Sequence, residues 1–137
     1  MLKISKSVEY SIFALKQIYF NSGSSLLKAK NIAYRENIPT EMVAKLLQKL
    51  KKNGILESVQ GKLGGYRYAT EPSQITLYSI VEAIDLEIQI TDCLCNNATK
   101  QDCVRIEDCS LRSPLSILQN EIIILMKNLK LTDLLKQ

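Results

Sequence analysis

Apolar side chains recur every three or four positions in the first part of the chain. A stripe beginning at Val8 predicts an amphipathic helix over residues 7–20, because this spacing places its members on one helical face. The polar, glycine-containing residues 21–25 then interrupt the pattern. A shorter stripe predicts a second helix that begins near Ala29 and stops near Asn37. The two stripes consist of Val8, Ile12, Leu15, Tyr19, Ala29, Ile32 and Ala33.

The next apolar stripe predicts a third helix that starts at Pro39-Thr40. Proline suits the first turn of a helix, and Asn53-Gly54 is typical of a helix end. Two short helices joined by a tight turn have the arrangement of a helix-turn-helix. The residues expected to point into the core are Val43, Leu46, Leu47 and Leu50.

Two short runs with strand character follow, at residues 55–60 and 66–69. The glycine-rich residues 61–65 between them predict a β-hairpin with a tight tip. A hairpin of this size is not stable alone, so we expect it to pack on the helices as a wing.

Residues 72–76 predict a linker, with Thr76 as the N-cap of a short helix. The apolar positions of that helix are Leu77, Ile80, Val81 and Ile84. Residues 86–112 then lose their periodicity and predict a long loop.

A long helix is predicted to start at Ser113-Pro114, a capping residue followed by a proline, and to reach about Leu131. Its apolar positions step by three and four, as in a short coiled-coil seam, and further isoleucines lie outside that seam. This surplus of apolar surface favours a homodimer, with residues 132–135 forming a final turn against the partner. The seam is Leu115, Leu118, Ile122, Leu125 and Leu129, and the surplus is Ile117, Ile123 and Ile124.

These elements predict a mainly α fold, a winged helix-turn-helix with a small β-hairpin wing and a long C-terminal dimerisation helix. We expect residues 1–75 to form the DNA-binding domain and residues 76–137 to form the cysteine loop and the dimerisation helix.

Charge is distributed unevenly along the chain. Residues 1–70 carry a balance of +8 and residues 71–137 a balance of −4. The first half is therefore the candidate for binding a polyanion such as double-stranded DNA, because Lys and Arg displace counterions from phosphates. The N-terminus lacks the uninterrupted apolar core of a signal peptide, and the longest apolar run, Ile122–Met126, is too short to cross a bilayer. We expect a cytoplasmic protein that does not bind a membrane.

All four cysteines lie between residues 93 and 109, among acidic and polar neighbours. In a reducing cytosol, clustered cysteines are more often metal ligands or redox switches than structural disulfides. Thiolates typically hold iron–sulfur clusters, but a structural zinc site and a metal-free thiol switch are also compatible with this pattern. An enzyme is not expected, because the chain has no histidine base, phosphate loop or serine elbow.

Several segments resemble the bacterial winged-helix iron–sulfur regulators typified by IscR and NsrR, the Rrf2 type. The resemblance runs nearly end to end and includes the wing motif Gly64-Gly65-Tyr66 and the three downstream cysteines. It implies a dimeric, DNA-binding repressor that senses nitric oxide, iron or redox state through a [2Fe-2S] or [4Fe-4S] cluster. The other matching segments are residues 9–15, 31–33, 37–39, 46–50, 53–56, 58–59, 61–63, 75–77 and 80–84.

The resemblance also implies the metal ligands. Cys95, Cys103 and Cys109 match the family's triad in spacing, and Cys93 is an additional thiol. IscR-like members use a histidine as the remaining ligand, which this chain does not contain. NsrR-like members take an acidic ligand from the first helix of the other subunit, where this chain has Glu9. The fourth ligand is therefore either the partner subunit's Glu9 or Cys93.

For DNA, we expect the start of the third helix to face the bases of the major groove, through Thr40, Glu41 and Met42. The phosphate contacts are expected from the remaining basic residues and from a wing glycine that lets the backbone approach closely. These residues are Lys28, Lys45, Lys49, Lys62, Gly64 and Arg67. A dimer would read a two-fold-related operator with half-sites about 10 bp apart.

Overall fold

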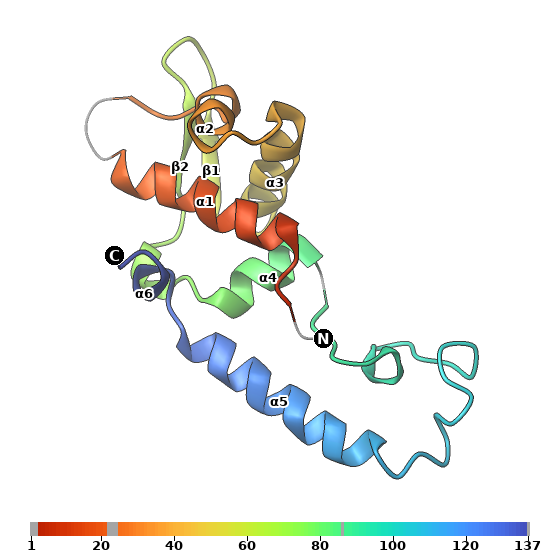
Figure 1. Ribbon diagram of the computed structural model, residues 1–137. Helices are drawn as coiled ribbons and strands as arrows, with labels where there is room; N and C mark the ends of the chain where they lie inside the picture. The colour runs from red at the N-terminus through yellow and green to blue at the C-terminus, as the bar shows by residue number, and fades with distance from the viewer. Residues whose placement is uncertain (1–2, 22–24, 86, 137) are drawn as a thin grey trace.

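The computed structural model describes residues 3–21, 25–85 and 87–136, and the middle of the predicted break at residues 21–25 lies outside these ranges. Three helices, α1 (Lys6–Phe20), α2 (Ala29–Glu36) and α3 (Thr40–Lys52), form the N-terminal part (Figure 1). The Ser5 side chain caps α1 by accepting a hydrogen bond from the Val8 amide at 3.2 Å. Asn37 ends α2 in the left-handed conformation, with φ of 53°. The three predicted helices are thus confirmed.

A two-stranded antiparallel sheet follows, formed by β1 (Leu56–Val59) and β2 (Gly65–Tyr68). Leu56 is opposite Tyr68 at the base of this wing, and Val59 is opposite Gly65 near its tip. The amide of Tyr66 also donates a hydrogen bond of 2.8 Å to the Leu27 carbonyl, just before α2. The wing is therefore attached to the helices through its second strand.

The predicted linker contains a short 3-10 turn, η1 (Pro72–Gln74), and leads to α4 (Leu77–Asp85). Thr76 caps this helix as expected, because its hydroxyl accepts a hydrogen bond from the Ser79 amide at 3.1 Å. The following loop contains only one short 3-10 turn among its described residues, η2 (Asp92–Leu94).

The C-terminal helix is shorter than predicted. It divides into α5 (Arg112–Asn128) and α6 (Leu131–Leu134). Leu111 is the N-cap of α5, so the expected cap at Ser113 is wrong. The helix stops at Asn128 because the next residues pair with the chain around the start of α4. The Leu77 amide donates to the Leu129 carbonyl at 2.9 Å, and the Leu131 amide donates to the Ile75 carbonyl at 2.8 Å.

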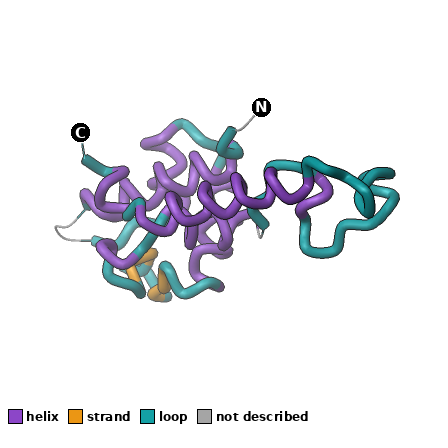
Figure 2. The backbone as a smooth tube through the Cα atoms, turned by 90° about the horizontal axis from the view of Figure 1, so that it is seen from below, coloured by secondary structure: helices purple, strands orange, loops and turns teal. Residues whose placement is uncertain are grey.

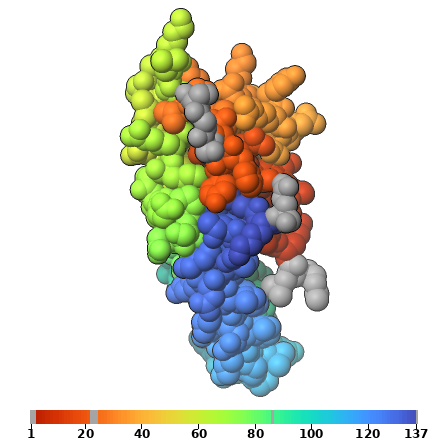
Figure 3. Space-filling view, turned by 90° about the vertical axis from the view of Figure 1, so that its left-hand side faces the viewer, coloured from red at the N-terminus to blue at the C-terminus, as the bar shows by residue number. Residues whose placement is uncertain are grey.

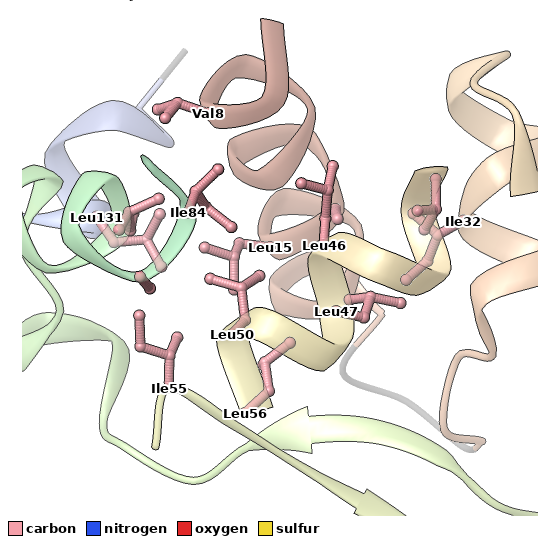
Figure 4. Close-up of a cluster of buried hydrophobic side chains, with 14 of the residues drawn as sticks. Val8, Leu15, Ile32, Leu46, Leu47, Leu50, Ile55, Leu56, Ile84 and Leu131 are labelled. Atoms are coloured by element: carbon pink, nitrogen blue, oxygen red, sulfur yellow. The ribbon is translucent and has the colours of Figure 1, made fainter. Parts of the chain in front are cut away.

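One buried cluster joins α1, α3, α4, the base of the wing and the C-terminal turn (Figure 4). The four predicted inward residues of α3 are all buried, which confirms that stripe. Leu131 and Leu135 belong to the same cluster, so the final turn packs within its own subunit, where contact with a partner was expected. The cluster includes residues on both sides of position 75, so residues 1–75 and 76–137 share one hydrophobic core. Their assignment to DNA binding and to the cysteine loop with its dimerisation helix stays a prediction.

The loop after α4 and the adjoining part of α5 project from this helical body (Figure 2). Helix α5 has 17 residues, and none of them is buried. The mainly α winged-helix architecture agrees with the prediction. In the part of the chain that the structure describes, no helix is both long and apolar enough to span a membrane.

Candidate nucleic-acid interface and cysteine loop

The start of α3 and the tip of the wing lie at the same end of the molecule, and the cysteine loop lies at the opposite end (Figure 1). Thr40, Glu41 and Met42 form the first turn of α3, and their side chains are exposed. The structure therefore brings the predicted base-reading residues to an accessible surface at the same end of the molecule as the wing tip (Figure 1).

Three of the predicted phosphate-binding lysines are exposed on the elements of the N-terminal half. Lys28 precedes α2, Lys45 is in α3, and Lys62 is at the wing tip; all three are exposed. None of the three ammonium groups has an ion-pair partner among the described residues. Their charges are available to an incoming polyanion.

The other three predicted contacts have structural roles within the fold. The Lys49 ammonium donates a hydrogen bond of 2.8 Å to the Ile84 carbonyl near the end of α4. The Arg67 guanidinium pairs with Glu57 on the neighbouring strand. Gly64 is buried, and a Cβ at this position would lie 2.0 Å from the Val59 carbonyl oxygen. A DNA contact by these residues stays a prediction.

A hollow between α3 and the wing contains residues that the sequence analysis missed. Gln48 and Lys51 line it from α3, Tyr66 lines it from β2, and Lys28 lies at its edge. The Gln48 amide donates a hydrogen bond of 3.0 Å to the Tyr66 hydroxyl, which links α3, the predicted recognition helix, to the wing. The sequence offered one signal for these residues: Gln48 and Lys51 are three positions apart, and residues with this spacing share one face of a helix.

The cysteine loop has an ordered framework of hydrogen bonds. The Ile90 amide donates to the Gln119 side chain of α5 at 3.0 Å. The Asp102 carboxylate accepts bonds from the amide and the hydroxyl of Thr99, and these bonds lower the pKa of Asp102 below its ordinary value. Ile106, within the loop, is buried. The turn before Cys103 is thus fixed by side chains of the loop itself.

All four cysteines are free thiols. Cys93 is buried in η2, with its sulfur 3.2 Å from the Thr91 hydroxyl, and the other three are half-buried. Cys109 lines a surface hollow together with Arg112 at the start of α5. Glu9 lies in the first turn of α1 and forms an ion pair of 2.6 Å with Lys6.

The donor set fits an iron–sulfur cluster in its chemistry, because four thiols are the ligand type that such clusters require. The arrangement is not a preformed cage. Within residues 3–21, 25–85 and 87–136, no three Cys, Asp or Glu side chains lie close enough together to hold a metal ion. Binding a cluster would therefore require the loop to bring Cys95, Cys103 and Cys109 together.

Known proteins that are similar to this chain are named as transcriptional regulators. A protein of Haemophilus influenzae, provisionally named as an HTH-type transcriptional regulator, is 30% identical over 118 residues, which cover 81% of this chain and 77% of that protein. The HTH-type transcriptional regulator IscR of Vibrio atlanticus is 29% identical over 92 residues, 67% of this chain. That match spans about half of the Vibrio protein, 53% of its length.

The fold is similar to that of CymR, the global cysteine regulator of B. subtilis, with a TM-score of 0.74 at 21% identity and coverage of 98% of this chain and 97% of the other. The family model Rrf2, described as an iron-dependent transcriptional regulator, matches residues 4–137. Members of this family are transcriptional regulators, in agreement with the expectation that the chain is not an enzyme. With its helix-turn-helix, wing and long C-terminal helix in place, this chain belongs to the Rrf2 family of winged-helix transcriptional regulators.

Proposed function

We propose that this regulator is a DNA-binding repressor that senses nitric oxide, iron supply or redox state through an iron–sulfur cluster. The observation that carries the proposal is the position of the thiols. Every cysteine of the chain lies in one loop, at the end of the molecule opposite the DNA-reading surface (Figure 1). A loop of this kind can report the state of a bound group to a distant site only through the intervening helices.

The residues that would hold the cluster are Cys95, Cys103 and Cys109, with Cys93 or the partner subunit's Glu9 as the fourth ligand. When bound, the cluster would supply a group that reacts with nitric oxide or oxygen, or that loses iron. A carboxylate in place of a fourth thiolate would hold its iron less tightly, because iron–sulfur clusters favour soft thiolate ligands. Such a ligand set suits a sensor.

The DNA would be bound by α3 in the major groove, with the lysines near the wing on the phosphates. The exposed first turn of α3 supports this orientation. The charge balance of +8 in residues 1–70 also supports it, because α3 and the wing both lie in this half of the chain.

The same proposal includes a homodimer. Helix α5 exposes large apolar side chains along its length, among them Ile117 at 61%, Leu118 at 46%, Ile124 at 51% and Leu125 at 68%. Contiguous apolar surface of this kind marks an interaction site in soluble proteins. A second copy of α5 would cover it and place two recognition helices on one two-fold operator.

The test uses anaerobically purified protein whose cluster has been reconstituted with iron and sulfide. Visible absorbance and DNA affinity are measured with and without nitric oxide. We expect the wild type to absorb in the visible and to change its affinity when nitric oxide is added. The Cys103→Ser variant should lose both properties and remain a folded dimer, because only a ligand is removed.

Ser110→Ala is the matched control, since Ser110 is an exposed residue next to Cys109 that is not assigned as a ligand. It should behave like the wild type. The Cys93→Ser variant identifies the fourth ligand: retention of the spectrum points to the partner's Glu9. A Cys103→Ser protein that kept its colour and its response to nitric oxide would contradict the proposal.

A metal-free thiol switch is the second candidate. It is favoured by the free thiols and by the absence of a three-ligand group among the described residues. The similar fold of Staphylococcus aureus CymR, which has been solved in an oxidized form, also favours it. In that case the protein would be colourless. A peroxide that oxidises two thiols to a disulfide, and is itself reduced to water, would change the DNA affinity, with a loss of two hydrogens per disulfide measured by mass spectrometry. A colourless protein that contains one zinc per chain would indicate the zinc-stabilised form.

A further inference from the structure

Leu63 lies in the turn at the tip of the wing. The Gly64 amide donates a hydrogen bond of 3.1 Å to the Gly61 carbonyl, which closes a β-turn with Lys62 and Leu63 as its two central residues. The Leu63 side chain is 83% exposed. In the space-filling view, the wing tip extends beyond the helices as a narrow projection (Figure 3). This leucine contributes almost nothing to the hydrophobic core.

The wing holds this turn in a defined position. Gly61 has a φ of 106°, and the buried Gly64 lies against the backbone of Val59, so the turn is compact. In the strand that leaves the turn, the Tyr66 amide donates a hydrogen bond to the Leu27 carbonyl. The Tyr66 hydroxyl accepts a hydrogen bond from Gln48 of α3. The tip is thus fixed relative to the recognition helix.

The surroundings of Leu63 are basic and polar. Lys62 is adjacent in the turn, and the hollow between α3 and the wing is lined by Lys28 and Lys51. A single exposed leucine on a protein surface is common. Here it stands at the projecting end of the surface that carries the lysines, where a bound duplex would meet it first.

We propose that Leu63 is an apolar wedge that enters the minor groove of the operator and partly unstacks one base step. The inference rests on the proposed DNA binding and adds to it a residue that reads the deformability of the DNA. The minor groove is about 6 Å wide, which suits the narrow tip of a hairpin better than a helix. Leucine is among the side chains that proteins insert between base pairs, and the inserted side chain bends the duplex.

The wedge makes a specific prediction about sequence preference. Steps such as TA unstack easily, whereas steps within A-tracts are stiff. The regulator should therefore prefer a TA step at the position that meets the wing, although no hydrogen bond from Leu63 reads those bases. Lys62 should contribute attraction to phosphates without this preference.

The test starts with duplexes that the wild-type protein selects from a random library of DNA. Two versions of a selected duplex are compared, one with a TA step and one with an AA step where hydroxyl-radical footprinting locates the wing. Affinity is measured by fluorescence anisotropy over a range of salt concentrations, and bending by energy transfer between dyes at the duplex ends.

We expect Leu63→Ala to weaken binding to the TA duplex about tenfold, to abolish the preference for TA over AA, and to reduce the bend. Its salt dependence should equal that of the wild type, because no phosphate contact is lost. Leu63→Met should keep the bend, since methionine can also act as a wedge. The control Lys62→Ala should show the opposite pattern, with a smaller salt slope and an unchanged bend.

An unchanged bend and an unchanged TA preference in Leu63→Ala would overturn the wedge while leaving DNA binding intact. A wild-type protein that selects no duplex at all would instead contradict the proposed function. Circular dichroism should show the same melting temperature for Leu63→Ala and the wild type, because the side chain is exposed.

Discussion

Tyr68 connects the wing to the first helix. Its hydroxyl donates a hydrogen bond of 2.6 Å to the Leu15 carbonyl, and the ring is partly buried against the core. Burial raises the pKa of Tyr68 above its ordinary value, because the charged phenolate would lose its hydration. The folded protein thus holds this proton at a pH where the unfolded chain has released it.

We predict that Tyr68→Phe lowers the free energy of unfolding by about 1 kcal/mol at neutral pH, the net value of one hydrogen bond. Stability from a raised tyrosine pKa is present below the unfolded pKa of about 10 and is lost as the pH rises above it. The wild type should therefore lose more stability than Tyr68→Phe between neutral and strongly alkaline pH. Urea denaturation at both pH values checks this, and equal losses would contradict it.

Gly65 is required by close packing at the junction of the wing and α2. Its φ is 156°, and a Cβ there would lie 2.6 Å from the Leu27 carbonyl oxygen. Gly54 also has a positive φ, of 75°, but the space around it is open. Substitution of Gly54 would therefore cause backbone strain alone, whereas substitution of Gly65 would also cause a steric clash.

We predict that Gly65→Ala costs about 3 kcal/mol of stability, and Gly54→Ala about 1 kcal/mol, because only the first adds a clash to the strained backbone. Chemical denaturation of both variants measures the difference. Equal costs would show that Leu27 moves aside without penalty.

At the scale of elements, α5 differs from every other long helix. Helix α3 buries four residues and α1 also buries four, whereas α5 buries none. It contacts its own subunit mainly through α4 and the segment before the cysteine loop, with Ile122 and Met126 facing that side. The remaining apolar surface is the proposed dimer interface.

We predict that the double substitution Leu118→Lys and Leu125→Lys converts the proposed dimer to a folded monomer, because dimerisation would then bury unpaired charges. Both side chains are exposed in the single chain, so folding itself should change little. Sedimentation analysis measures the mass. The control Asn120→Lys, an exposed polar position of the same helix, should remain dimeric; a dimeric double variant would refute the α5 interface.

At the scale of the whole molecule, the positive half of the chain forms one end and the cysteine loop the other (Figure 1). Lys49 lies between them and connects α3 to the end of α4 through the Ile84 carbonyl. The Ser5 hydroxyl connects α1 to the same end of α4, donating to Asp85 at 2.8 Å. Under the proposed function, a movement of the segment after α4 would reach α3 through the Lys49 contact.

We predict that Lys49→Met reduces the response of DNA affinity to nitric oxide and leaves the slope of log affinity against log salt unchanged. The reason is that its ammonium binds a carbonyl of the protein. Lys51→Met should instead reduce the slope by about one, as expected for the loss of one phosphate contact. Anisotropy titrations at several salt concentrations compare the two, and a reduced slope for Lys49→Met would place it on the DNA.

Local patterns predicted the helices and the wing, because a stripe such as that of α3 reports burial within one element. They failed where distant segments pair. The end of α5 depends on backbone hydrogen bonds between residues 75–77 and 129–131, and no periodicity within either segment indicates them. Short-range spacing also could not indicate the partners of Lys49 and Arg67, because these partners lie on other elements; a DNA contact by either residue stays a prediction.

The sequence by itself determined the fold class, the charged half and the position of all the thiols, since composition and short-range spacing contain that information. Only the tertiary structure decided which lysines remain available and that α5 has an uncovered apolar surface. It also decided that the wing tip and the start of α3 share one end of the molecule. These properties depend on contacts between residues far apart in the chain, and such contacts exist only once the core has formed.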